Sequence, residues 1–106
     1  MEEARYHQIS EEFLNRLSLA LEALDEDGAL EADYQGGILT INLPSGKQLL
    51  VSKHTASRQI WLASPFSGGL HFSYSAGRWV LADGRELSAV LSQELKQLAQ
   101  IDVAFE

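Results

Sequence analysis

The sequence contains no cysteine and only two prolines among its 106 residues. The absence of cysteine excludes disulfides, thiolate metal sites and cysteine nucleophiles. No apolar run approaches the roughly 18 residues that a membrane-spanning helix needs. The amino-terminal segment MEEARYHQISEE is charged and acidic, so it resembles neither a secretory signal nor a transit peptide. We therefore expect a soluble cytoplasmic protein with no membrane segment.

Motifs for catalysis are also missing. Ser64 and Ser67 lie near Gly68-Gly69, but there is no G-x-S-x-G motif for an activated serine. No phosphate-binding loop of the G-x-x-x-x-G-K type is present. The acidic side chains are expected on the surface, away from the kind of pocket that shifts a carboxyl pKa for acid–base chemistry. The sequence therefore predicts a protein that is not an enzyme.

Basic residues are scarce in the first third of the chain. Residues 1–33 hold ten of the fifteen carboxylates but only two of the eight Lys and Arg residues, which gives this segment a formal charge of −8. Residues 34–106 carry five acids and six bases, for a formal charge of +1. A field concentrated at one end attracts cations or basic protein surfaces and repels nucleic acid.

The periodicity of the apolar residues predicts one domain over residues 1–106. Apolar residues recur at helical spacing over 4–24 and again from Leu87 to Leu98, and the segments between them alternate as strands do. The expected strands are 30–35, 38–43, 47–54, 57–64, 70–75 and 78–81. Gly36-Gly37 indicates a hairpin turn, and short turns throughout indicate an antiparallel sheet. We predict an α+β two-layer sandwich with both helices on one face of a twisted sheet.

Two local features accompany this fold prediction. Asp83 followed by Glu86 resembles a capping box at the start of the second helix, with Asp in place of the usual Ser or Thr. The tail from Ile101 to Phe105 alternates apolar residues with others, so we expect it to pack back onto the domain.

Acidic side chains lie at spacings that bring them together on the first helix and the first strand. His7 and Glu11 are i,i+4 neighbours, and Glu22 is three and four residues from Asp25 and Glu26. Carboxylates suit hard cations such as ferric iron and manganese, and an imidazole also suits ferrous iron. The candidate metal-binding residues are Glu22, Asp25, Glu26, Asp27, Glu31, Asp33, His7 and Glu11.

The simplest alternative for these acids is a solvated helix face. Two penalties argue against it: the like charges at 22 and 25–27 have no base at helical spacing, and they crowd the helix carboxyl terminus, where the macrodipole disfavours negative charge. Ser18 and Leu19 interrupt the acids at mid-helix, so the cluster from Glu22 to Asp33 is the better candidate. No closed cage is expected, so binding should be weak and other divalent cations should substitute.

A second candidate surface lies on the sheet. In the strand 57–64, Ile60 and Leu62 should face the helices, which leaves Gln59 and Trp61 on the open face. In the preceding strand, Ser52 and His54 should point the same way. An exposed tryptophan among polar neighbours is a good anchor for a protein partner. The alternative is a tryptophan that only covers its cross-strand neighbours.

One series of motifs resembles a known family. Gln59-Ile60-Trp61-Leu62-Ala63-Ser64-Pro65 is followed in order by Ser67-Gly68-Gly69, His71-Phe72, Arg78-Trp79-Val80 and Asp83-Gly84. Together with the upstream Gly36-Gly37 turn and the acidic helix, this series resembles the frataxin family over the whole chain, and within it the bacterial CyaY type.

The resemblance implies a non-enzymatic role, with ferroxidase activity as a family-level alternative. It implies weak binding of Fe²⁺ or Fe³⁺ through acids of the first helix and strand. It also implies docking on a cysteine desulfurase and on the scaffold protein of iron–sulfur cluster assembly, by a monomer that metal can drive to oligomerise. The competing hypothesis is an acidic module that docks on a basic partner, with metal binding incidental.

Overall fold

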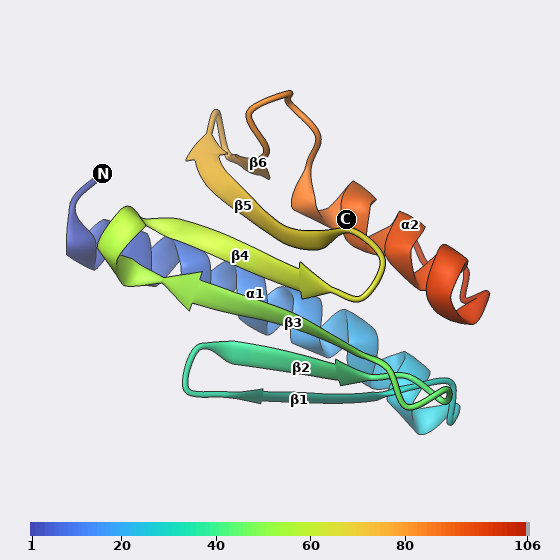
Figure 1. Cartoon of the computed structure of the whole chain (residues 1–106). Coiled ribbons are helices and arrows are strands. Elements are labelled where there is room, and N and C mark those ends of the chain that lie inside the picture. The colour runs from blue at the N-terminus through green and yellow to red at the C-terminus, as the bar shows by residue number, and fades with distance from the viewer. Residues whose placement is uncertain (106) are drawn as a thin grey trace.

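The computed structural model describes residues 1–105 and orders them as one helix, a six-stranded meander and a second helix (Figure 1). A single 3₁₀ turn, Thr55–Ser57, interrupts the strands. The elements are α1 (Glu3–Glu26), β1 (Glu31–Gln35), β2 (Ile38–Asn42), β3 (Gln48–His54), β4 (Gln59–Ser64), β5 (Gly68–Ser75), β6 (Arg78–Val80) and α2 (Leu87–Ala99).

The sheet is antiparallel throughout, and its strands lie in chain order from β1 to β6. The β1–β2 turn shows why the sequence folds this way. Gly36 and Gly37 have φ angles of +58° and +80°, a conformation that side chains other than glycine rarely adopt and that tight hairpins require. The predicted hairpin at this position is confirmed.

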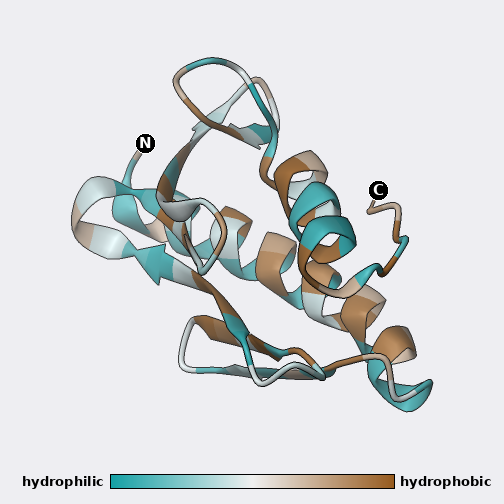
Figure 2. Ribbon diagram, turned by 45° about the vertical axis from the view of Figure 1, so that its right-hand side comes forward, coloured by the Kyte–Doolittle hydropathy of each residue, from teal (hydrophilic) through white to brown (hydrophobic). Residues whose placement is uncertain are grey.

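Both helices cover the same face of the sheet, so the predicted two-layer α+β sandwich is confirmed (Figures 1 and 2). The strand side chains that alternate toward the helices form the core together with the buried stripe of each helix, as the period of two predicts. Fully buried members include Leu39, Ile41, Leu49, Val51, Ile60, Leu62 and Phe72. The opposite face of the sheet is left open.

The buried stripe of α1 is rotated slightly from the one that the apolar spacing predicts, which runs through Ile9, Phe13, Leu17, Ala20 or Leu21, and Leu24. Its most buried residues include Tyr6, Leu14, Leu17 and Leu21, whereas Ile9 and Phe13 are only partly buried. The rotation brings the Tyr6 hydroxyl under the sheet, where it donates a 2.6 Å hydrogen bond to the backbone carbonyl of Gln59.

The predicted capping box is wrong. The N-cap of α2 is Glu86, and no side chain there caps the helix. The Asp83 carboxylate instead accepts the backbone N–H of Arg85 at 3.1 Å and its Nε–H at 2.9 Å. A short-range bond of this kind competes with a cap, and the positive φ of Gly84 (+91°) turns the chain to allow it.

The bounds of all six strands differ from those predicted, those of β1, β2, β3 and β6 by one residue and those of β4 and β5 by two. β4 begins at Gln59, because Arg58 is left-handed (φ +57°) and ends the 3₁₀ turn before it. β5 begins at Gly68, two residues before the predicted start. The tail does pack back as predicted: Ser92 Oγ donates to the Val103 carbonyl at 2.8 Å, and Phe105 lies against the core. Among residues 1–105, no helix is long and apolar enough to cross a membrane.

Candidate cation site and partner surface

The predicted metal-binding residues lie along one edge of the molecule, on α1 and on the neighbouring edge strand β1. We call this set the acidic ridge: His7, Glu11, Glu22, Asp25, Glu26, Asp27, Glu31 and Asp33. Antiparallel packing of α1 against β1 brings the two segments together, although eight residues or more separate Glu22 from Glu31 and Asp33 in the chain. The ridge has two ends with different surroundings.

The carboxyl end of the ridge surrounds a shallow depression of about 490 Å³ between α1 and β1. Four of the predicted ligands line it: Glu22, Asp25, Glu26 and Asp33. None of these four takes part in the ion pairs found among residues 1–105. Since no ion pair found in residues 1–105 offsets their charges, these carboxylates give the depression a negative electrostatic potential.

Asp25 has a structural role at the same time. Its Oδ2 accepts the backbone N–H of Ala32 at 2.9 Å, which fixes the end of α1 to the edge strand. Asp25 also lines a neighbouring depression of about 290 Å³ together with Glu31. Asp27 is the C-cap residue of α1 and lines neither depression. The carboxyl end of α1 is strongly hydrophilic (Figure 2).

The amino end of the ridge contains a base that no sequence pattern placed there. Lys53, from β3, lies with its Nζ 2.6 Å from His7 Nδ1 and 3.1 Å from Glu11 Oε1. Its side chain is only 10% exposed, and Nζ also lies 5.7 Å from the centroid of the Tyr6 ring. The depression here, of about 540 Å³, is lined by all three of the hydrogen-bonded residues.

Tyr34 lines the depressions at both ends of the ridge. Burial raises the pKa of the Tyr34 phenol, and the negative charge of Glu11 raises it further. The ridge is not a closed cage, because residues 1–105 contain no group of three or more His, Asp or Glu side chains arranged to hold a metal ion. The geometry is that of an open, multiply acidic surface.

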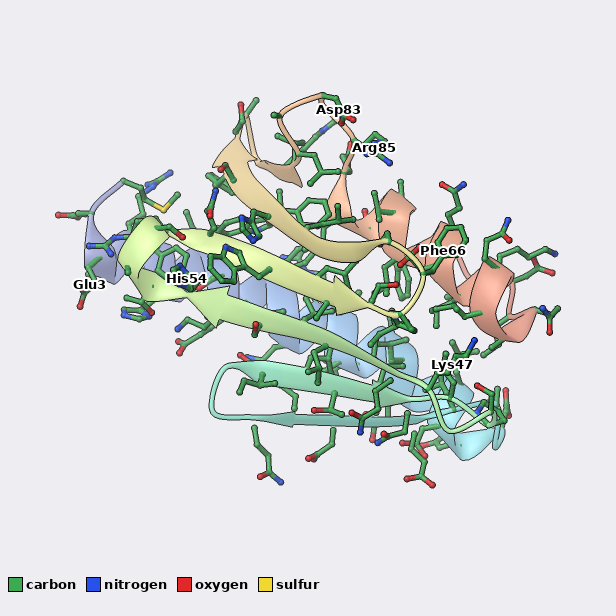
Figure 3. The ribbon with its side chains drawn as sticks, in the orientation of Figure 1. Glu3, Lys47, His54, Phe66, Asp83 and Arg85 are labelled. Carbon is green, nitrogen blue, oxygen red and sulfur yellow. The ribbon has the colours of Figure 1, made fainter. Side chains whose placement is uncertain are left out.

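The open face of the sheet carries the second candidate surface. Trp61 is half-buried there, and the indole is stacked between two imidazoles. Its ring centroid is 3.6 Å from that of His54 and 4.0 Å from that of His71, with interplanar angles of 9° and 11°. Figure 3 labels His54 at the end of β3. Both faces of the indole are therefore covered by imidazole rings.

A hydrogen-bond network fixes this stack. Gln59 Oε1 accepts the Trp61 Nε1–H at 2.9 Å and the Ser57 hydroxyl at 2.9 Å, while Gln59 Nε2 donates to Ser73 Oγ at 3.1 Å. His54 Nδ1 lies 2.6 Å from Ser57 Oγ. The structure thus brings Gln59, Trp61 and His54 into contact on the open face.

Ser52 also faces outward, directly across from Trp61 in the β3–β4 register. Among the residues of β2 to β5, Lys53 is the only Asp, Glu, Lys or Arg. Because side chains alternate along β3 and Val51 is buried, Lys53 points to the helix side, and no such residue points outward from these four strands. The central part of the open face is therefore uncharged apart from its histidines, and charged side chains face outward only from the edge strands, as Glu31 and Asp33 do on β1 and Arg78 does on β6.

Sequence reasoning missed two residues of these surfaces, His71 and Lys53. His71 was recognisable in principle, because a tight turn between β4 and β5 that pairs Ser64 with Gly68 also pairs Trp61 with His71. Lys53 could not be recognised from the sequence, because its contacts with Glu11 and His7 span 42 and 46 residues and depend on how α1 is rotated on the sheet.

The helix, six-strand meander and helix, with an acidic edge at α1 and β1, define a frataxin-type fold. The frataxin from Psychromonas ingrahamii has this fold: it superposes with a TM-score of 0.89 over 100% of this chain and 99% of its own, at 21% identity. A trimeric frataxin from the yeast Saccharomyces cerevisiae, complexed with ferrous iron, superposes with a TM-score of 0.77 at 28% identity, over 88% and 87% of the two chains.

The chain belongs to the frataxin family, in its bacterial CyaY type. Residues 1–101 match the model of the frataxin-like domain. The iron–sulfur cluster assembly protein CyaY of Vibrio vulnificus is 35% identical over 102 residues, which cover 93% of each chain. Its counterpart from Vibrio cholerae is 37% identical over 97 residues, covering 89% of this chain and 88% of the other. The predicted family membership is confirmed.

Proposed function

We propose that this protein acts in iron–sulfur cluster assembly as a regulator, or as an iron donor and adaptor, and that it binds iron weakly through the acidic ridge. Iron is cargo in this role. The observation that carries the proposal is the depression between α1 and β1, which Glu22, Asp25, Glu26 and Asp33 line and whose four carboxylates take part in no ion pair found among residues 1–105. The CyaY relatives named for iron–sulfur cluster assembly and the ferrous complex of yeast frataxin support it.

The two surfaces have different binding chemistry, which supports two kinds of partner. The ridge fits a basic patch on a cysteine desulfurase, with an association that salt weakens. The uncharged open face around Trp61, with Gln59, Ser52 and His54, fits the assembly scaffold protein through packing and hydrogen bonds. The protein works as a cytoplasmic monomer that cations can drive to oligomerise by neutralising the ridge.

A purely electrostatic docking module is the second candidate function. It is favoured by the absence of a closed metal cage among residues 1–105. In that case the ridge binds its basic partner, and cations bind only as counterions.

An amide NMR titration with Mn²⁺, followed by Fe²⁺ under anaerobic conditions, separates these functions. The proposal expects broadening that is confined at first to the segment from Glu22 to Asp33, with His7 and Glu11 affected only as a second patch. No local broadening at millimolar metal would leave the docking module alone.

Two variants assign the effect to the ridge. Glu22→Gln with Glu26→Gln should abolish the broadening, and it spares Asp25, whose carboxylate holds Ala32. Glu2→Gln with Glu12→Gln is the matched control, because it removes the same charge from exposed positions that line neither end of the ridge. Equal losses in both double variants would show that only net charge matters.

A third variant tests the assignment of the two surfaces. Trp61→Ala should weaken binding to the scaffold protein and leave Mn²⁺ binding unchanged. Loss of Mn²⁺ binding in this variant would contradict the separation of the surfaces. If the charge variant loses Mn²⁺ but keeps the desulfurase, the ridge is a metal site and not a docking site.

A further inference from the structure

Lys53 is almost buried in the one place along the ridge where a cation would meet both an imidazole and a carboxylate. It reaches this position from β3, and its aliphatic stem covers Gly37, where an added Cβ would lie 3.2 Å from Lys53 Cδ. The Lys53 side chain is thus held at two points: its stem lies over Gly37, and its ammonium group lies near the Tyr6 ring.

The contact between Lys53 and His7 fixes the state of the imidazole. An ammonium group has only protons to offer, so Nζ is the donor and His7 Nδ1 must accept through its lone pair. In a neutral imidazole whose Nδ1 accepts, the other nitrogen carries the proton, and here Nε2 lies 3.8 Å from a Glu3 carboxylate oxygen. His7 therefore has no free lone pair for a metal while Lys53 is in place.

The charge of Lys53 adds to this effect. Nζ is 3.1 Å from Glu11 Oε1, so a divalent ion bound by Glu11 and His7 would sit within a few ångströms of a poorly solvated positive charge. At such separations the repulsion is large in any medium less polar than bulk water. No comparable base pairs with the carboxylates at the other end of the ridge, as far as residues 1–105 show.

We propose that Lys53 is a built-in cation that determines where the ridge binds metal: it closes the His7–Glu11 end and confines divalent ions to the end lined by Glu22, Asp25, Glu26 and Asp33. The inference rests on the proposed function in taking the ridge as a metal-binding surface. It predicts that one substitution opens a second metal site without adding a ligand.

The test is an Mn²⁺ titration of Lys53→Met, followed by amide NMR. Methionine keeps most of the aliphatic stem over Gly37 and removes the charge and the donor. New broadening should appear at His7, Glu11 and Gly37, with Mn²⁺ binding at this end at least about tenfold tighter than in the natural protein. Adding His7→Gln to Lys53→Met should remove the new site.

Lys47→Met is the matched control. It makes the same change in net charge at an exposed residue that takes part in no ion pair among those described for residues 1–105, far from His54 and Glu3 (Figure 3). The same broadening in Lys47→Met, or none at the amino end in Lys53→Met, would overturn the inference. If Lys53→Met does not fold, as amide dispersion will show, Lys53→Gln replaces it.

The outcomes also separate the inference from the proposed function. If the natural protein shows no broadening at Glu22–Asp33 but Lys53→Met gains a site at His7 and Glu11, the proposed carboxyl-end site fails and the role of Lys53 stands. If the natural protein binds Mn²⁺ at Glu22–Asp33 and Lys53→Met gains no site, the proposed carboxyl-end site stands and the role of Lys53 fails.

Discussion

Replacing Tyr6 with Phe should destabilise the protein by an amount that depends on pH. Tyr6 is fully buried, and its hydroxyl donates a 2.6 Å hydrogen bond to the Gln59 carbonyl. Phenylalanine keeps the ring and its edge-on contact with Trp79, whose centroid is 6.1 Å away, so the change removes the hydrogen bond and little else. Such a loss costs about 1–2 kcal/mol of unfolding free energy, or a melting temperature lower by roughly 5–10 °C in a domain of this size.

The pH dependence follows from the burial of the phenol. Burial raises the Tyr6 pKa above its usual value of 10.0, so the folded protein holds this proton more tightly than the unfolded chain does. The stabilisation is fully present below pH 10 and is lost as the pH rises through the folded-state pKa. Phenylalanine has no proton to lose. The stability gap between the natural protein and Tyr6→Phe should therefore narrow above about pH 10.

Urea unfolding at neutral pH and at several alkaline pH values measures this gap. Tyr74→Phe is the control, because Tyr74 makes no hydrogen bond through its hydroxyl among the bonds found for residues 1–105 and its ring contact with Trp79 is retained. It should change stability by less than about 0.5 kcal/mol. Equal stability of Tyr6→Phe and the natural protein at pH 7, or a gap that does not change between neutral and alkaline pH, would refute the reasoning.

Three further substitutions test other parts of the fold. Ser67→Ala removes the 2.9 Å donor to the buried Glu94 carboxyl and should cost about 1–3 kcal/mol in urea unfolding, with Ser67→Thr restoring most of it. Ile60→Ala empties a fully buried core position and should cost about 2–5 kcal/mol. The hydrogen bond from the backbone N–H of Arg85 lowers the pKa of Asp83 below its usual value. The ionised Asp83 therefore stabilises the fold at a pH above that usual pKa, and this stabilisation is lost as the pH falls through the lowered pKa. Asp83→Asn should melt below the natural protein at pH 7 and together with it near pH 2; a gap that persists in acid would contradict this.

The fold could be predicted because local signals agreed with the long-range arrangement. Alternation placed Leu39 and Ile41 in the core, the Gly36-Gly37 turn set the first hairpin, and the spacing of leucines marked α2. The capping box failed where two local interactions compete: an Asp side chain can bond to the residue two positions on as readily as to a helix start. Sequence alone does not say which bond wins.

The candidate site could be predicted only where the relevant neighbours are close in the chain. Glu22, Asp25 and Glu26 share a helix face by spacing, and one hairpin register pairs Trp61 with His71. The position of Lys53 depends on the rotation of α1 about its axis, which the apolar periodicity determines only within about one residue. A rotation of α1 by one residue decides whether Lys53 reaches His7, so the sequence could not predict this contact at the amino end of the ridge.

The separation of charge on the sheet bears on how the proposed partners would bind. Most of the carboxylates lie on α1 and β1, while the outward side chains of β2 to β5 carry no formal charge other than a histidine can supply. A basic partner attracted to the ridge therefore gains nothing by covering Trp61, and a partner that packs on Trp61 need not neutralise the ridge. The Tyr6 hydrogen bond joins α1 to the start of β4, and together with the shared core it holds the two surfaces in a fixed relation. We therefore predict that the two proposed partners can bind at the same time, and that salt should weaken the first association far more than the second.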